Sequence, residues 1–147
     1  MIQPYFYKCK TVRIIDGDTV DADIQLGFNV TLSKTRIRLY NIDTPESRTR
    51  NLEEKALGLK AKERLIELLG EKFYIESLGE GKSKGKYGRV LAEVWVNGIN
   101  VNEDLVKKGH AVRYHGQSKE DIEMEHMENR QLLIDKGVFD PSSVKEK

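Results

Sequence analysis

The sequence predicts an α+β fold, mainly β, in which five short strands form a small barrel that carries three α-helices. Two observations support this class. Apolar residues first recur at every second position, as in strands, and from Asn51 onward they recur at helical spacing. The elements follow one another as three strands, a helix, two strands and two helices, without a repeat or linker. We therefore expect one domain over residues 1–147, with its core at about 8–137.

The first two strands are predicted on either side of an aspartate-glycine turn. One strand ends at Ile15, and Asp16-Gly17-Asp18 follows it, with the Asp-Gly pair as a strong hairpin signal. Gly27 then indicates either a bend or bulge in one long strand, or a tight turn between two strands. The alternating apolar residues of this region are Val20, Ala22, Ile24, Leu26, Phe28, Val30 and Leu32.

The third strand alternates Ile37 and Leu39 with arginines and ends before Pro45, which cannot donate to a strand ladder. A helix is predicted from Asn51, which resembles the start of a capping box, to a glycine cap at Gly70. Its apolar stripe consists of Leu52, Ala56, Leu59, Leu65, Ile66 and Leu69.

The remaining elements follow a Gly/Lys-rich loop, GEGKSKGKYG. Five short twisted strands with a helix between the third and the fourth are typical of a Greek-key barrel of the oligonucleotide/oligosaccharide-binding (OB-fold) type. The predicted elements are strands at 73–75 and 90–96, a short helix at 101–108 that Gly109 ends, and a last helix from near Ser118 to Gly137.

Composition narrows the function classes. The 25 basic and 24 acidic residues leave a net charge of +1, so any site for a polyanion must be a local patch. The lone Cys9 excludes an internal disulfide and a cysteine metal cluster, and we expect a buried thiol. No apolar run suggests a membrane span. The N-terminus lacks the pattern of a signal peptide. We therefore expect a cytoplasmic protein, a phage-encoded protein or a mature secreted fragment.

Three segments with chemically useful side chains lie where predicted strands end. They are IDGDT at 15–19, DTPE at 43–46 and KYGR at 86–89. Taken singly, the first is consistent with a hairpin turn, the second with the end of a strand and the third with a basic loop. Taken together, their side chains can converge on one rim of a barrel, which favours a phosphoryl-transfer site.

The acidic residues of these segments suit a hard metal ion. Asp18 and Asp43 supply carboxylate oxygens, and a backbone carbonyl such as that of Thr44, with waters, completes the roughly 6–8 oxygens that Ca²⁺ prefers. No Cys or His is spaced for zinc, and we assign the three histidines no role. Without a metal these carboxylates should repel one another, so Asp18→Asn is expected to stabilise the metal-free protein by about 1 kcal/mol.

The arginines and the remaining acid suit the phosphate and the water. Arg38 and Arg89 can grip a phosphate with planar, two-pronged donors. Glu46 can take a proton from an attacking water or position that water. In such a site, positioning and charge stabilisation supply most of the rate.

The segments IDGDT, RLYNIDTPE, KYGR and VNEDLVKKGHA, in this order and spacing, resemble the staphylococcal (micrococcal) nuclease, or thermonuclease, family over roughly residues 8–136. The resemblance implies a five-stranded barrel with three helices. It also implies a Ca²⁺-dependent phosphodiesterase that hydrolyses DNA and RNA, preferably single-stranded, and leaves 3′-phosphate and 5′-hydroxyl ends. We expect a monomer without a protein partner.

The resemblance further implies a role for each matching position. Asp18 and Asp43 would be direct Ca²⁺ ligands together with the Thr44 carbonyl, and Asp16 would act on the metal through water. Arg38 and Arg89 would clamp the phosphate, and Glu46 would be the general base. Lys86 and Tyr87 would hold a neighbouring phosphate, and Tyr114 would stack on a base.

An alternative of another class is a non-catalytic OB-fold module that binds single-stranded nucleic acid or a partner. Such a module has no physical need for a metal cage beside two arginines. The presence of the complete set therefore favours the enzyme: Asp18, Arg38, Asp43, Glu46 and Arg89.

Overall fold

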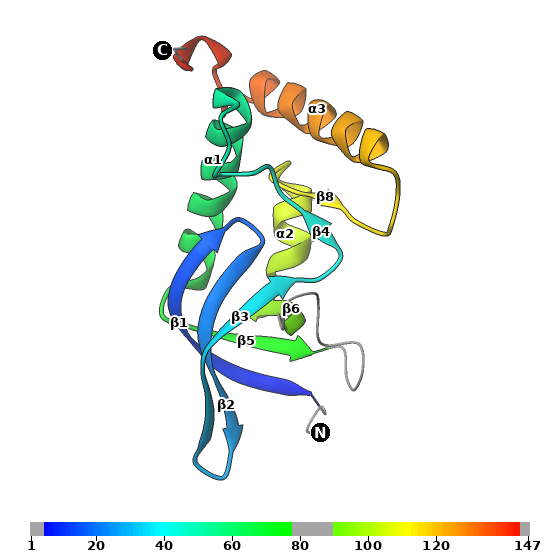
Figure 1. Ribbon diagram of the computed structural model, residues 1–147. Helices are drawn as coiled ribbons and strands as arrows, with labels where there is room; N and C mark the ends of the chain where they lie inside the picture. Colours follow the sequence, from blue (N-terminus) through cyan, green and yellow to red (C-terminus); the bar gives the residue numbers. More distant parts are fainter. Residues whose placement is uncertain (1–4, 78–89, 145–147) are drawn as a thin grey trace.

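The computed structural model describes residues 5–77 and 90–144, and Figure 1 shows the arrangement of their elements. The predicted order of three strands, helix, two strands and two helices is confirmed, with three very short strands and a 3-10 turn in addition. In chain order the elements are β1 (Phe6–Asp16), β2 (Thr19–Gly27), β3 (Val30–Leu39), β4 (Ile42–Asp43), α1 (Leu52–Leu69), β5 (Lys72–Ser77), β6 (Val90–Val96), β7 (Ile99–Asn100), α2 (Val101–Lys107), β8 (Val112–Arg113), α3 (Lys119–Asp135) and η2 (Pro141–Ser143).

Five strands close into a barrel. The sheet order is β3-β2-β1-β5-β6-β7, and β3 also pairs with β6. That closing pair is parallel and runs from Ile37 opposite Val90 to Leu39 opposite Ala92, whereas the other pairs in the sheet are antiparallel. The closed barrel, with three α-helices in the described residues, confirms the fold class predicted from the sequence.

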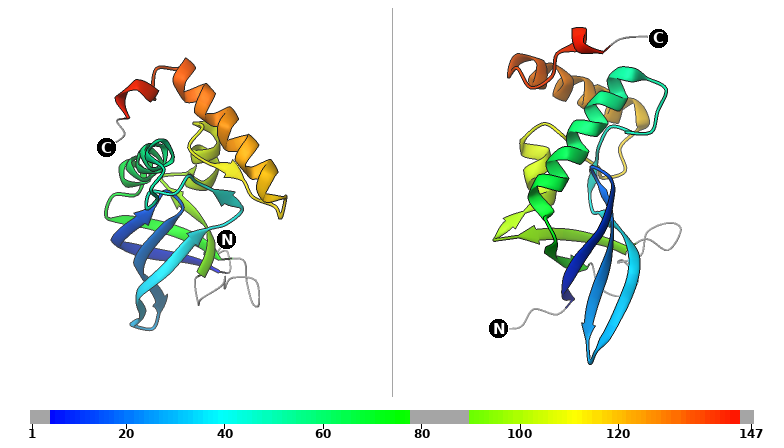
Figure 2. Two further views of the ribbon diagram at one scale, coloured as in Figure 1. Left: turned by 45° about the horizontal axis from the view of Figure 1, so that its top comes forward. Right: turned by 90° about the vertical axis from the view of Figure 1, so that its left-hand side faces the viewer.

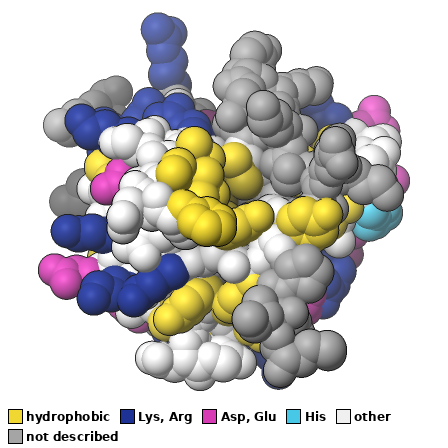
Figure 3. All heavy atoms as spheres, turned by 90° about the horizontal axis from the view of Figure 1, so that it is seen from below, with side chains coloured by type: hydrophobic (Ala, Val, Ile, Leu, Met, Phe, Trp, Pro, Cys, Tyr) yellow, Lys and Arg dark blue, Asp and Glu magenta, His cyan; other side chains and the backbone are white. Residues whose placement is uncertain are grey.

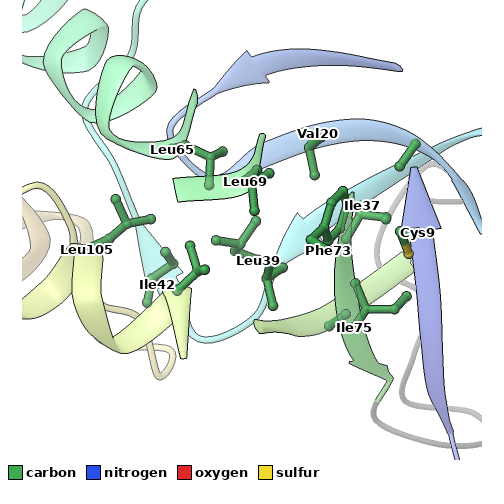
Figure 4. Close-up of a cluster of buried hydrophobic side chains, with 14 of the residues drawn as sticks. Cys9, Val20, Ile37, Leu39, Ile42, Leu65, Leu69, Phe73, Ile75 and Leu105 are labelled. Carbon is green, nitrogen blue, oxygen red and sulfur yellow. The ribbon is translucent and has the colours of Figure 1, made fainter. Parts of the chain in front are cut away.

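The barrel interior is filled from alternate strand positions and from the inward face of α1 (Figure 4). Full burial of one Val, Leu, Ile or Phe side chain stabilises the folded protein by roughly 1.5–3 kcal/mol relative to an exposed side chain. The core also holds Cys9, which is 1% exposed, and burial raises the pKa of this thiol to about 12. The largest fully buried side chains are Phe73, Ile37, Leu39, Leu65, Leu69, Ile75, Leu105, Val20, Val94 and Val101.

The long alternating segment is a hairpin. Gly27, Phe28 and Asn29 have φ values of 89°, 54° and 62°, and Gly27 pairs with Val30. The second alternative, a tight turn between two strands, is therefore the correct one. Because the hairpin extends beyond the barrel (Figure 1), its alternation continues past Ile24 without a layer to cover it. The exposed apolar residues there are Leu26, Phe28, Val30 and Leu32.

Hydrophobic side chains gather in patches on the face of the molecule that is seen from below (Figure 3). In the part of the chain that the structure describes, no helix is long and apolar enough to cross a membrane.

The helices begin and end at the expected signals. The Asn51 side chain accepts a hydrogen bond from the Glu54 backbone N–H at 3.1 Å and caps α1, while Gly70 ends that helix with a φ of 57°. Ser118 caps α3 in the same manner. Helix α1 runs beside β1, and α3 lies across the end of the molecule that carries β4 and β8 (Figures 1 and 2).

A small two-stranded sheet, absent from the sequence prediction, joins the end of β3 to the segment before α3. In it, Ile42 pairs with Arg113 and Asp43 pairs with Val112. The backbone N–H of Tyr114 continues the contact by donating to the carbonyl of Asn41 at 2.8 Å. This pairing fixes the backbone of Asp43 beneath α3.

Candidate functional site

Asp18 is the most firmly held of the predicted site residues. Its side chain lies in the β1–β2 turn and its residue is 8% exposed. The Thr19 hydroxyl donates to Oδ1 at 2.9 Å, and the Thr44 backbone N–H donates to Oδ2 at 3.2 Å. The Asp18 carbonyl in turn accepts from the backbone N–H of Leu39 at 2.8 Å. Hydrogen bonds thereby join the turn to the end of β3 and to the residue that follows β4.

The Arg38 guanidinium lies between two carboxylates. Its Nη1 is 3.1 Å from Asp18 Oδ2, and its Nη2 is 3.6 Å from Asp43 Oδ1. The Arg38 side chain is 18% exposed, so these ion pairs are less screened than surface pairs. Asp18 and Asp43, which are distant in sequence, therefore converge on one cationic group.

The remaining acids complete a pocket of about 250 Å³. Asp16 accepts a hydrogen bond from the Ser47 hydroxyl, which fixes its carboxylate at the pocket wall. Partial burial raises the pKa of Glu46 above its ordinary value, and the carboxylates of Asp16 and Asp18 raise it further. The pocket is lined by Asp16, Asp18, Thr19, Arg38, Asp43, Thr44, Pro45 and Glu46.

Six of the ten residues singled out from the sequence thus line one pocket. Tyr114 is attached to this region through the hydrogen bond from its backbone N–H to the Asn41 carbonyl, and the residue is 46% exposed. Lys86, Tyr87 and Arg89 lie outside the described residues. Among residues 5–77 and 90–144, no group of three or more Cys, His, Asp or Glu side chains is arranged so that it could hold a metal ion.

A family model described as "Staphylococcal nuclease homologue" matches residues 36–132, which contain Arg38, Asp43 and Glu46. The chain belongs to the staphylococcal nuclease family. An uncharacterized endonuclease from Haemophilus influenzae is 31% identical over 139 residues, which are 91% of this chain and 70% of that protein. The thermonuclease of Staphylococcus hyicus is 32% identical over 103 residues, which are 69% of this chain and 56% of that protein.

This chain spans only part of the length of several other relatives. Endonuclease YncB of Bacillus subtilis is 36% identical over 67% of this chain and 44% of its own length. The chain spans 46% of an uncharacterized Bacillus anthracis protein and 64% of Protein ParB of Escherichia coli, both of which are 36% identical over the matched residues.

Sequence reasoning missed one contact of this nuclease-family site. His126, in α3, places Nε2 2.8 Å from Asp43 Oδ2. The two residues are 83 positions apart, and a lone histidine in an acidic helix gives no signal without the topology. From the sequence the three histidines have no assigned role, and the structure places one of them, His126, in contact with a predicted site residue.

Helix α1 touches the backbone of the acid-bearing segments through small residues. A Cβ added at Gly58 would lie 2.6 Å from the Glu46 carbonyl oxygen and 2.7 Å from that of Pro45. A Cβ added at Gly17 would lie 2.6 Å from Ala61 Cβ. Such distances are too short for real contacts, so glycine permits the close packing that positions Glu46.

Gly58→Ala tests this packing because two effects predict opposite signs. Helix propensity alone predicts a gain of about 1 kcal/mol in the free energy of unfolding. Overpacking against a backbone carbonyl costs about 1–3 kcal/mol. We expect net destabilisation in urea unfolding, together with slower turnover, because the displaced atoms belong to Glu46.

The control for Gly58→Ala is Lys55→Ala, an exposed change in the same helix that should leave both measurements near the parental values. A more stable Gly58→Ala protein with parental turnover would show that the helix does not constrain Glu46.

Proposed function

We propose that this chain is a Ca²⁺-dependent nuclease that hydrolyses phosphodiester bonds in DNA and RNA. The core of its nuclease domain would comprise about residues 8–137. The observation that carries the proposal is the convergence of Asp18 and Asp43 on one cationic group, in a pocket that also contains Glu46. Relatives named endonuclease and thermonuclease support the same reaction class. We further propose a monomer that prefers single strands.

The donor set suits Ca²⁺. We propose that the carboxylates of Asp18 and Asp43 and the carbonyl of Thr44 hold the ion, with Asp16 acting through a water. These are hard oxygen ligands, and the approach of both carboxylates to the Arg38 guanidinium is consistent with a shared cation position. When bound, Ca²⁺ would stabilise charge on the phosphate and lower the pKa of a bound water.

The protein's own groups would then position the phosphate and accept the proton. Arg38 lines the pocket and can turn from the two carboxylates to a phosphate, which it matches with two parallel donors. Glu46 can accept a proton from the attacking water, and its raised pKa brings it closer to the range useful for a general base.

By resemblance, we propose that Arg89 provides the second phosphate clamp and that Lys86 and Tyr87 hold a neighbouring phosphate. The exposed ring of Tyr114 is available to stack on a base.

A non-catalytic binding module is less consistent with this pocket. Asp16, Asp18, Asp43 and Glu46 would repel a polyanion, and among the described lining residues Arg38 supplies the positive charge. A surface selected only for binding would not gather four carboxylates where the phosphate must lie. A metal that neutralises them removes this difficulty.

The proposal predicts cleavage of single-stranded DNA and of RNA with millimolar Ca²⁺ and its loss on adding a chelator. Gel analysis of end-labelled oligonucleotides gives the activity, and treatment with a phosphatase or a 5′-kinase identifies the ends. We expect 3′-phosphate and 5′-hydroxyl products. Cleavage that survives chelation would contradict the metal requirement, and 5′-phosphate products would contradict the end chemistry.

A further inference from the structure

The Asp43 carboxylate is held differently from that of Asp18. Both oxygens of Asp18 accept hydrogen bonds from residues that line the pocket, Thr19 and Thr44. In the part of the chain that the structure describes, the side-chain partners of the Asp43 carboxylate are Arg38, 3.6 Å from Oδ1, and His126, 2.8 Å from Oδ2. One of these partners, Arg38, is needed elsewhere when a phosphate binds.

We propose that His126 is the positioning residue for Asp43: its Nε2–H donates to Oδ2 and holds the carboxylate so that Oδ1 faces the pocket. This inference rests on the proposed Ca²⁺ site. Once Arg38 turns to a phosphate, the contact from α3 still fixes the orientation of Asp43. Partners of this kind, which bind a metal ligand rather than the metal, commonly change metal affinity 10–100-fold when removed.

The geometry favours positioning over a simple anchor for α3. Helix α3 has other attachments: Arg130 donates twice to Glu53, at 2.9 and 3.1 Å, and the Asn129 side-chain amide donates to the Ala111 carbonyl at 3.0 Å. Leu133 is also buried, with 3% exposure. The helix therefore stays docked without His126, whereas Asp43 loses a well-formed hydrogen bond.

The test compares His126→Ala and His126→Gln with the parent protein. The readout is the Ca²⁺ concentration that gives half of the thermal stabilisation, with a nucleoside bisphosphate present, and calorimetric titration with Ca²⁺ checks it. We expect His126→Ala to raise this midpoint by roughly 10- to 100-fold. His126→Gln, whose amide N–H can replace Nε2–H, should recover most of the affinity. The metal-free melting temperature should change little.

Two controls separate positioning from loosening of the helix. His115→Ala removes an exposed histidine and should behave as the parent. Arg130→Gln weakens the attachment of α3 to Glu53 without touching Asp43, so it should lower the metal-free melting temperature and leave the Ca²⁺ midpoint unchanged.

Four outcomes would overturn the inference. A parental midpoint in His126→Ala would show that the contact does not position Asp43. An equal rise in Arg130→Gln would assign the effect to helix docking. A much larger loss of Mn²⁺ than of Ca²⁺ binding in His126→Ala would indicate a direct metal ligand. A parent protein that does not respond to Ca²⁺ would overturn the proposed metal site itself, and the inference with it.

Discussion

Arg38→Lys is expected to lower kcat by about 100- to 1,000-fold while changing KM much less. Lysine keeps the charge but loses the planar fork. In the structure one guanidinium reaches Asp18 with one nitrogen and Asp43 with the other, at 3.1 and 3.6 Å. A single ammonium cannot reproduce that two-point geometry toward two carboxylates, nor toward two oxygens of a phosphate whose charge grows in the transition state.

The matched control for Arg38→Lys lies two residues away on the same strand. Arg36 pairs with Asp21 through two hydrogen bonds of 2.9 and 3.1 Å, and its side chain is 49% exposed. Arg36→Lys should therefore retain near-parental kinetics with a single-stranded oligonucleotide. If Arg38→Lys instead raises KM and leaves kcat unchanged, Arg38 is a ground-state phosphate contact. The corresponding change at Arg89 is expected to act as Arg38→Lys does.

Much of the fold was predictable because its signals are local. The cap at Asn51 and the glycine at Gly70 are read from neighbouring residues, and both are found where expected. The hairpin marks the limit of this reasoning. Alternation reports which side chains share a face of a strand, and it does not report whether another layer covers that face. The same pattern therefore continues from buried Ile24 to exposed Leu32.

In the candidate site, the acidic residues were predictable from local motifs, whereas the contacts that orient them were not. Asp18 lies in the turn after β1 and Asp43 ends β4, both within recognisable motifs, so chemistry and position in the sequence point to the same residues. The contacts that orient the acids connect distant segments: Ser47 lies 31 residues from Asp16, and His126 lies 83 residues from Asp43. The two-residue pairing of β4 with β8 is too short to leave a periodic pattern. These contacts follow from topology, which the local pattern does not specify.

One energetic expectation changes for the same reason. Repulsion among the acids suggested that removing the charge of Asp18 would stabilise the metal-free protein. The structure instead gives Asp18 a partly buried cationic partner, Arg38, and two hydrogen-bond donors, Thr19 and Thr44. An amide can keep the bond from the Thr44 N–H, but it loses the ion pair with Arg38. The change is therefore expected to destabilise the metal-free protein by about 1 kcal/mol.

If Asp18 holds Ca²⁺ as proposed, Asp18→Asn should also abolish cleavage and the response to Ca²⁺, because it would remove a direct ligand from a site with few protein oxygens. We expect the parent to bind Ca²⁺ weakly, with a Kd of roughly 10⁻⁴ to 10⁻³ M. Since the ion would bind only the folded state, the parental Tm should rise as Ca²⁺ passes that concentration, and more so with a nucleoside bisphosphate.

Thermal melts of the parent, Asp18→Asn and the control Asp21→Asn, with and without millimolar Ca²⁺, measure both effects. Asp21 pairs with Arg36 outside the pocket, so its variant should keep the Ca²⁺ shift. A parental shift in Asp18→Asn would remove Asp18 from the metal site, because a protein that has lost a direct ligand cannot bind the ion with unchanged affinity.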